Sequence, residues 1–447
     1  MSESLDTRAP AAHADVPPRR GALALAALLF GGAGIALWRS TTAPAAAVAA
    51  LCALWVAAWC ALRAVVRTPR RTFALRAMAV HLALGLCVLV LEAGTLAGVD
   101  YRLVLRQPVV APSRDPHYVP DDDMRYVARP GWRTSGDRAP GNIAVICRVP
   151  DPEEHAFDVA FDARGFRNPE PLEQADAVLV GDSMLLEAYV PEGETVPALL
   201  RRGADCTAYS LAHTGWGPGE ELAALRRVGL GLRPRAVVWF FYEGNDLSDL
   251  RVYQEFVADR KASFRERHGF VQRSFTHNAL ERIVTWIGKP RPDAAPRSGR
   301  LVRDGVAQNV YFMQPPQGDG PYDGATFGDL AEILRAAHGA CSAADAEFVV
   351  AFVPQKFRAL GHLLTYAPDS EAASWKPTDV DERLEHAVRS LGAGATYVDL
   401  TPALRRQAEE GELPYFRDDT HLSVAGCAAV GAALVPVVRA ALAAHAH

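Results

Sequence analysis

Three long apolar runs open the chain, and much shorter apolar runs follow them. The long runs span residues 21–38, 45–62 and 77–99, and only His81 and Glu92 interrupt the third. A helix needs about 20 apolar residues to cross the hydrocarbon core of a bilayer. Because the runs lack a polar face, the pattern predicts three transmembrane helices rather than three buried helices of a globular domain.

From residue 166 onward the pattern becomes that of an α/β domain. Short apolar runs bounded by turn residues predict five buried parallel strands. They lie at residues 177–180, 207–211, 236–242, 347–353 and 396–400. Helical stretches lie between them or follow them, at about 195–203, 218–230, 325–344, 380–391 and 423–445. The alternation predicts a doubly wound sheet, in which ligands bind at the carboxyl ends of the strands.

Two segments fall outside this alternation. Residues 101–165 are irregular and rich in Pro, Asp and Arg, which favours a spacer outside the membrane that leads into the domain. Residues 255–322 mix charged, aromatic and Pro/Gly-rich pieces without a period. We interpret them as an insertion, which is either a lid or substrate-binding flap or a plain surface excursion. The expected organisation is an anchor over residues 1–100, the spacer, and an α/β domain over residues 166–447.

Charge is unevenly distributed along the chain. The 447 residues are 49% hydrophobic and carry a formal net charge of -5, which argues against a nucleic-acid binder. Residues 1–110 hold eleven Arg and five acids, a net +6, so the remainder carries -11. The Arg residues gather before the first apolar run and between the second and third. The positive-inside rule therefore predicts an inner-membrane protein whose later residues lie in the periplasm.

A cleaved signal peptide is the alternative interpretation of the first apolar run. Two further apolar runs follow, so the protein would stay in the membrane in either case. The seven cysteines show no metal-ligand spacing. Three lie in the apolar runs, and the other four lie where either disulfides or buried thiols can form, namely Cys147, Cys206, Cys341 and Cys427.

Residues with catalytic chemistry follow the first three strands. Ser183, in Gly181-Asp182-Ser183, begins a helix, where backbone N–H groups favour a developing negative charge. A glycine cluster from Gly215 to Gly219 follows the second strand and lets backbone amides approach a substrate closely. Asn245 follows the third strand and carries side-chain N–H groups for an oxyanion. Taken singly, each is also an ordinary turn or helix cap.

A fourth group precedes the last helix. His421 can take a proton from a serine, and Asp418, three residues earlier, can orient the imidazole ring. Asp419 competes for that role, and the spacing favours Asp418. A surface histidine with capping acids is the alternative. The four groups together indicate one site at one edge of the sheet.

These four blocks resemble the SGNH (GDSL-type) hydrolase superfamily over residues 165–447. The resemblance implies a three-layer α/β/α sandwich with a five-stranded parallel sheet. It implies Ser183 as the nucleophile, His421 as the base and Asp418 as the residue that orients His421. It also implies an oxyanion hole made of the Ser183 amide, the Gly215 amide and the Asn245 side chain. The second block lacks the family's usual Asn before its glycine, which leaves Gly217 as an alternative to Gly215.

A narrower resemblance concerns the alginate-type polysaccharide O-acetylation proteins. Val353-Pro354-Gln355-Lys356, after the fourth strand, is similar to their Pro-x-Lys turn. The resemblance makes Lys356 a candidate substrate contact, with a solvated Lys as the alternative. Asp182, beside the expected nucleophile, is a second candidate for substrate binding.

The expected function is that of a membrane-anchored serine esterase or deacetylase. Its substrate would be an O-acyl ester of a carbohydrate or cell-envelope glycan, and the chemistry requires no metal or cofactor. One alternative is an O-acetyltransferase of an exported polysaccharide that works with a separate membrane acyltransferase partner. A third is a glycan-binding scaffold without catalysis. The sequence does not choose the acyl group or the alcohol.

Overall fold

The chain divides into two units in the computed structural model. The described residues are 24–26, 28–29, 44–66, 69–99, 101, 105, 118–147, 149, 151–258, 274–287, 297–303, 305–316 and 324–444. The first unit comprises residues 1–107 and 269–292, and the second comprises residues 108–268 and 293–447. A part of the predicted insertion therefore belongs to the unit that contains the predicted membrane anchor.

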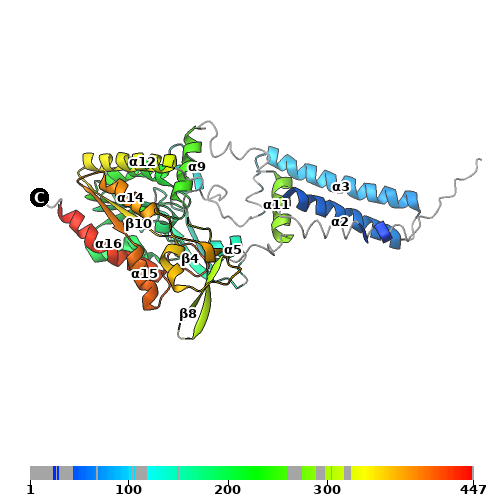
Figure 1. The fold of residues 1–447 in the computed structure, drawn as a ribbon. Coiled ribbons are helices and arrows are strands. Elements are labelled where there is room, and N and C mark those ends of the chain that lie inside the picture. The colour runs from blue at the N-terminus through cyan, green and yellow to red at the C-terminus, as the bar shows by residue number, and fades with distance from the viewer. Residues whose placement is uncertain are drawn as a thin grey trace, which may run out of the picture. The chain divides into compact units, whose positions relative to one another are not determined.

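A five-stranded parallel sheet forms the centre of the second unit, in the order β11-β10-β7-β5-β6 (Figure 1). Its strands are β5 Ala177–Gly181, β6 Ala208–Ala212, β7 Ala236–Tyr242, β10 Glu347–Val353 and β11 Ala395–Asp399. Each lies within one residue of its predicted bounds, so the α/β fold is confirmed. The strands are easy to recognise because both faces of the sheet are covered, which requires nearly continuous apolar runs.

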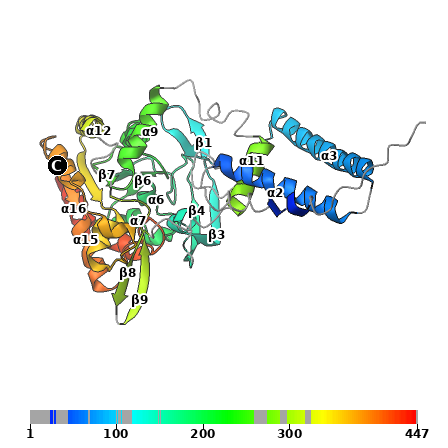
Figure 2. The ribbon, with the colours of Figure 1, turned by 45° about the vertical axis from the view of Figure 1, so that its right-hand side comes forward.

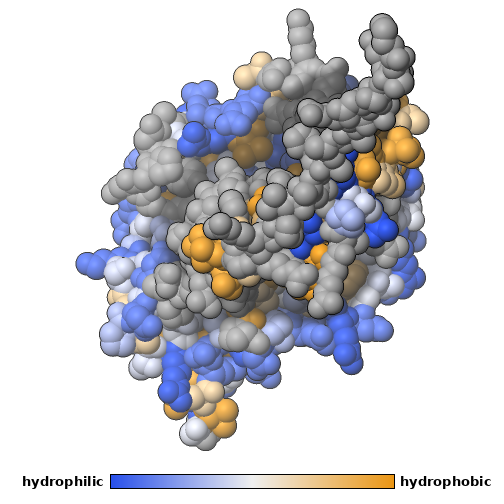
Figure 3. Space-filling view, turned by 90° about the vertical axis from the view of Figure 1, so that its right-hand side faces the viewer, coloured by the Kyte–Doolittle hydropathy of each residue, from blue (hydrophilic) through white to orange (hydrophobic). Residues whose placement is uncertain are grey.

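Helices cover both faces of this sheet (Figure 1). Alternate residues of β5 enter different clusters, with Leu179 in one and Val180 in the other. The first cluster is completed by α7 Val196–Ala204, α15 Thr401–Glu410 and α16 Val424–Ala444. The second is completed by α8 Pro218–Ala224, α9 Asp246–Ala258, α12 Gly324–Ala343 and α14 Val380–Arg389. The result is the expected three-layer sandwich. The described side chains around the periphery of the face in Figure 3 are mainly hydrophilic.

The segment before the sheet differs from the predicted irregular spacer. It forms two antiparallel pairs and a short helix, shown in cyan in Figure 2. They are β1 Tyr118–Asp121, β2 Arg125–Ala128, β3 Arg133–Pro140, α5 Asn142–Cys147 and β4 Glu154–Ala160. Met124, Tyr126 and Val159 are buried in the clusters that flank the sheet. Residues 118–160 are therefore an integral part of the second unit.

The predicted insertion consists of separate pieces. The last four residues of α9, 255–258, fall within the predicted insertion and belong to the second unit. An antiparallel hairpin of β8 Ser298–Arg303 and β9 Val306–Tyr311 also belongs to the second unit. Between them, α11 Phe275–Ile287 belongs to the first unit, where it packs on α3. The lid or flap interpretation of residues 255–322 stays a prediction.

Two helices of the first unit match predicted spans. They are α2 Pro44–Val65 and α3 Arg70–Leu96, while the predicted first span lies outside the described residues except for five helical positions. Two helices in the described chain are long and apolar enough to cross a membrane, residues 71–96 and residues 424–444. The second is α16, which packs on α7 and α15. Three transmembrane helices are therefore not confirmed, and α3 is the best supported.

The candidate active site

The candidate nucleophile lies at the end of β5, the strand between β7 and the edge strand β6. Asp182 follows the strand, and its carboxylate accepts the Met184 backbone N–H at 2.8 Å, which caps the short helix α6 Ser183–Leu186. The Ser183 hydroxyl lies 3.4 Å from Asp182 Oδ2. A side chain at position 181 would approach Phe240 Cβ to 3.0 Å, so the strand-to-helix turn requires Gly181. The turn exposes Ser183 at the carboxyl edge of the sheet.

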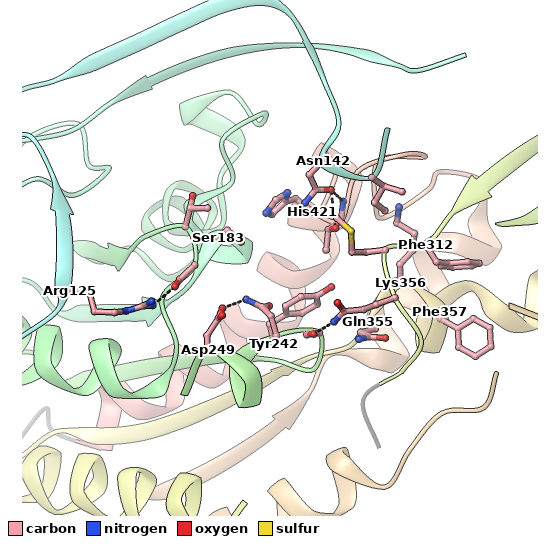
Figure 4. Close-up of a pocket in the computed structure, with 18 of the residues that line it drawn as sticks. Arg125, Asn142, Ser183, Tyr242, Asp249, Phe312, Gln355, Lys356, Phe357 and His421 are labelled. Carbon is pink, nitrogen blue, oxygen red and sulfur yellow. Dashed lines mark hydrogen bonds between the residues drawn. The ribbon is translucent and has the colours of Figure 1, made fainter. Parts of the chain in front are cut away.

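A cavity of about 360 Å³ opens at this edge (Figure 4). Five of the residues singled out from the sequence line it, namely Ser183, Gly215, Asn245, Lys356 and His421. They come from the ends of four strands and from the loop before α16. Aromatic and aliphatic side chains make up part of the wall, including Phe312, Met313 and Phe357. The fold therefore brings the sequence-predicted blocks together around one space, of the size of a small-ligand site.

His421 is held by Asp419 and not by Asp418. The ring Nδ1 lies 2.6 Å from Asp419 Oδ1, and the same oxygen accepts the backbone N–H of His421 at 2.8 Å. The predicted role of Asp418 is wrong for this reason. An acid two residues before a histidine can close an Asx-turn onto the histidine N–H. That turn places the carboxylate beside the ring Nδ1, and Nε2 stays available for proton transfer.

The two groups shift each other's pKa in opposite directions. Burial lowers the pKa of His421, but the charge and hydrogen bond of Asp419 outweigh burial and raise it above its ordinary value. Burial raises the pKa of Asp419, but the His421 charge and hydrogen bond, with the N–H groups of Asn142 and His421, hold it well below its usual range. Asp419 is therefore ionised at neutral pH, as an orienting carboxylate must be.

Asp418 takes part in a different network behind the loop. Its carboxylate accepts the Glu153 backbone N–H at 2.8 Å and lies 3.8 Å from His155 Nε2. Glu153, His155 and Asp418 are the one group of three among the described residues that could hold a metal ion. Arg417 lies 3.4 Å from Glu153 Oε1 and 3.5 Å from Asp418 Oδ2. Because Arg417 already balances the two carboxylates, we interpret the group as an ion-pair network.

Asn142, in the segment predicted as a spacer, holds the loop that carries Asp419 and His421. Its backbone N–H donates to Asp419 Oδ2 at 2.6 Å, so both carboxylate oxygens of Asp419 are bound. Its side-chain oxygen accepts the backbone N–H and the hydroxyl of Thr420, both at 2.9 Å. Asn142 also lines the cavity (Figure 4). Nothing in the local sequence around Asn142 indicates this role, because its partners are almost 280 residues away.

The same segment holds the glycine turn after β6. The Tyr126 hydroxyl donates to the Thr214 carbonyl at 2.8 Å, and the Arg125 guanidinium donates to the Gly215 carbonyl at 2.5 Å. Since the C=O and N–H of one peptide are coplanar, holding the Thr214 oxygen fixes the direction of the Gly215 amide. Gly215 has φ +70°, which favours glycine, and lines the cavity, whereas Gly217 begins α8. The geometry thus favours Gly215 as the amide donor.

Asn245 is engaged by two carboxylates. Its Nδ2 donates to Asp182 Oδ2 at 3.2 Å and to Asp249 Oδ2 at 2.5 Å. Burial raises the pKa of Asp249 to about 7, opposed by Asn245 and Arg125, and burial also raises the pKa of Asp182. To donate to an oxyanion, Asn245 must release one carboxylate. Asp182 is buried behind Ser183 and Asn245, so it orders these residues and is poorly placed for the predicted contact with substrate.

Lys356 binds the catalytic loop from behind. Its ammonium donates to the backbone carbonyls of Tyr311 at 3.1 Å, Phe416 at 2.7 Å, Arg417 at 3.3 Å and Asp419. Burial lowers the pKa of Lys356 to about 7, opposed by the nearby acids Asp419, Asp418 and Glu153. An ammonium with four carbonyl partners has no hydrogen left for a ligand. Lys356 therefore positions the loop that carries Asp419 and His421, and its contact with substrate stays a prediction.

Comparison with known families assigns the C-terminal part of this unit. Residues 320–447 match the family model described as "SGNH hydrolase-like domain, acetyltransferase AlgX". These residues are similar to an SGNH hydrolase-like domain. The matched residues include β10, Lys356 and the loop with Asp419 and His421, whereas Ser183 precedes them. The resemblance seen in the sequence is confirmed at the level of the superfamily and of its AlgX-type similarity. No curated protein matches the chain.

The solved structures that resemble this chain are distant from it in sequence. TesA is 14% identical with a TM-score of 0.32, over 59% of this chain and 98% of that chain. A carbohydrate esterase family 2 enzyme of Myceliophthora fergusii is 14% identical with a TM-score of 0.32, over 66% and 71%. A GDSL-like lipase of Bacteroides thetaiotaomicron is 13% identical with a TM-score of 0.29, over 59% and 88%.

Proposed function

We propose that the protein is a membrane-anchored serine esterase that removes an O-acyl group from a carbohydrate or cell-envelope glycan. The observation that carries the proposal is the shared cavity of Ser183 and His421, with His421 bound to the ionised Asp419. Nucleophile, base and orienting acid are the three parts of an activated serine. The similarity of residues 320–447 to an SGNH hydrolase-like domain supports an enzyme of the hydrolase or esterase type.

The proposed reaction uses the free nitrogen of His421. With Nδ1 held by Asp419, Nε2 takes the proton of the Ser183 hydroxyl while Oγ attacks the ester carbonyl. Negative charge develops on the carbonyl oxygen, which the amides of Ser183 and Gly215 and the Asn245 side chain stabilise. The bond to the alcohol oxygen then breaks, and His421 returns its proton to that oxygen. Water attacks the acyl-serine in the same way and releases the acid.

An O-acetyltransferase is the second candidate. The matched family model is named for the acetyltransferase AlgX, and a sugar hydroxyl in place of water would turn the same acyl-serine into a transfer reaction. The second step is then attack of the sugar oxygen on the acyl carbon, with its proton passing to His421; the bond between the acyl carbon and Ser183 Oγ breaks, and His421 returns the proton to Oγ. A separate membrane acyltransferase would deliver the acyl group on this interpretation. A non-catalytic glycan-binding scaffold is disfavoured by the paired Asp419 and His421.

The location proposed is the inner membrane, with the SGNH hydrolase-like domain on the periplasmic side. Support comes from α3, whose apolar stretch 71–96 is not buried in the protein, and from the Arg distribution along residues 1–110. Glycans of the cell envelope are present on that side of the membrane.

Ester hydrolysis by the purified full-length protein tests the proposed function. With p-nitrophenyl acetate as the probe, Ser183→Ala is expected to lower kcat by at least about 10³-fold, because the nucleophile is lost. The matched control is Ser390→Ala, an exposed serine at the end of α14. Equal activity of wild type and Ser183→Ala contradicts the nucleophile. Acetylated glycan formed when a glycan acceptor is added, at the expense of free acetate, favours the transferase.

A further inference from the structure

The helix α11 connects the second unit back to the first. The chain leaves the SGNH hydrolase-like unit after residue 268 and returns to it at residue 293. Between these points, α11 packs on α3, the helix that is best suited to cross the membrane. The segment that the sequence indicated as a lid or surface excursion thus contributes an element to the anchor.

Apolar residues recur on one side of α11. Phe275, Ala279 and Ile283 are spaced four residues apart, and Leu280 extends the same side. By the same spacing, His277 lies on the side of the helix opposite Phe275 and Ala279, whereas Arg282 lies beside Phe275. Leu280 and Ile283 are 39% and 40% exposed although they are large and apolar. A helix with this pattern suits a boundary between an apolar and an aqueous medium.

Glu92 of α3 fixes the beginning of α11. Its Oε1 accepts the Thr276 backbone N–H at 2.7 Å, and its Oε2 accepts the Thr95 hydroxyl at 3.3 Å. Thr276 is the second residue of α11, where backbone N–H groups lack partners within the helix. Glu92 therefore caps α11 and has a structural reason to interrupt an apolar run.

Glu92 also sets the depth of α11. It lies four residues before the end of α3, about 6 Å along the helix axis at 1.5 Å per residue. That end of α3 continues toward the SGNH hydrolase-like unit. Tyr101, just beyond α3, is 7% exposed and packs its ring on Phe275, with ring centroids 5.4 Å apart. The beginning of α11 is thus tied to the outer end of the apolar helix.

Large apolar side chains are also exposed on α3, the helix on which α11 packs. Leu82, Leu86 and Leu89 of α3 are between 63% and 67% exposed, as expected for side chains that face lipid. The same medium would cover Leu280 and Ile283 at the membrane boundary. Water would be the alternative, and it is unfavourable for two large aliphatic side chains on one helix face.

We propose that α11 lies in the interface of the membrane on the side of the SGNH hydrolase-like unit, with Leu280 and Ile283 in contact with acyl chains. The unit is then attached to the bilayer at two points of its sequence, after α3 and through α11. The proposal rests on the membrane anchor proposed above and is independent of the ester chemistry.

Spin labels on the full-length protein test this placement. The protein is reconstituted in vesicles of phosphatidylethanolamine and phosphatidylglycerol, with all cysteines replaced by serine except the buried Cys341 and Cys427. Single cysteines at positions 283 and 277 report the two sides of α11. Positions 86 and 410 serve as references for lipid and for water, because Leu86 is in α3 and Glu410 is exposed on α15.

Accessibility to oxygen, which concentrates in acyl chains, is compared with accessibility to a water-soluble nickel chelate. We expect the label at 283 to be several-fold more accessible to oxygen relative to nickel than the label at 277, and to approach the label at 86. Equal, water-like values at 283 and 277 overturn the proposal while position 86 remains lipid-like. Low accessibility to both reagents at 283 indicates a protein partner and also overturns it. A water-like label at 86 refutes the membrane anchor itself.

Discussion

At the scale of single residues, the site depends on which of two adjacent acids faces the histidine. Asp419 contacts the ring of His421 and has both oxygens bound, whereas Asp418 faces Glu153 and His155. The sequence narrowed the choice to these two acids. The spacing favoured Asp418, whereas the structure shows Asp419, because the contact depends on the turn that Asn142 and Lys356 impose on the loop.

The first prediction compares Asp419→Asn with Asp418→Asn. The base form of His421 is neutral, so hydrolysis should rise with pH through a pKa that lies above the ordinary histidine value. Without the Asp419 charge, burial dominates and the pKa of His421 falls, so the rising limb of the pH profile moves to lower pH. The maximal kcat of Asp419→Asn should also fall by about 10³–10⁴-fold, because the ring loses its orientation.

The control variant Asp418→Asn should keep the position of the limb and lose less than about tenfold in kcat, the scale of one lost hydrogen bond. The measurement is kcat between pH 5 and pH 9 for the three proteins. If the two variants exchanged these behaviours, Asp418 would be the orienting acid after all.

The second prediction concerns Tyr126, which acts on the reaction through Gly215. Tyr126→Phe removes the hydroxyl bound to the Thr214 carbonyl and frees the peptide that carries the Gly215 amide. We expect kcat to fall about 5–20-fold with little change in KM, because the lost bond serves the transition state. Amide hydrogen exchange over residues 213–219 should become faster.

Tyr397→Phe is the matched control, since its hydroxyl also binds a carbonyl, that of Asp381 at 3.3 Å, on the edge strand β11. It should change neither measurement. Unchanged exchange over residues 213–219 in Tyr126→Phe would show that Tyr126 does not hold the turn, whatever happens to the activity.

At the scale of elements, the parts that were predicted from the sequence and the parts that were missed have different origins. The strands of the sheet are buried on both faces, so each gives an apolar run that stands out locally. By contrast, β3 is mainly exposed and polar, and its pairing with β4 is what makes it a strand. Segment 118–160 is ordered by contacts with residues 214–220 and 417–420, and local sequence carries no record of such distant contacts.

The third prediction addresses the element that carries His421, the loop at residues 416–421. Lys356→Met keeps the length of the side chain but leaves four backbone carbonyls without their shared donor. Unsatisfied buried acceptors cost about 1–3 kcal/mol each where they cannot reach water. We expect a loss of about 2–4 kcal/mol in the free energy of unfolding and at least tenfold in kcat, because Asp419 and His421 lose their placement.

Lys376→Met provides the comparison, because Lys376 is exposed and lies on the same unit. Chemical denaturation and steady-state hydrolysis are measured on both variants. A Lys356→Met protein that is stable and fully active would leave the lysine without a positioning role, and a KM effect alone would favour the predicted substrate contact.

At the scale of the whole molecule, two units are joined by more than one stretch of chain. Residues 1–107 and 269–292 form one unit, so the boundary between units is crossed three times. The sequence predicted the apolar runs and their charge asymmetry but treated the anchor as a purely N-terminal feature. The sequence did not predict that α11 belongs to the anchor unit, because the amphipathic pattern of one short helix does not reveal which element its apolar side contacts.

The fourth prediction is the orientation of the molecule in the membrane. Alkaline phosphatase fused after Val110 should be active, because that enzyme folds in the periplasm and the Arg distribution places residue 110 there. A fusion at residue 68, between α2 and α3, is the internal control and should be inactive. Activity at both positions would indicate that α3 does not cross the membrane in the expected direction.

The long separation between Asn142 and the loop that carries Asp419 has a consequence for how the enzyme is made. Their bonds join residues 277 and 278 positions apart. Segment 118–160 is synthesised early and cannot acquire its partners until the last quarter of the chain has followed. Such non-local contacts form slowly. A polypeptide that stops before residue 416 would therefore lack the proposed general base and would leave Asn142 without its partners.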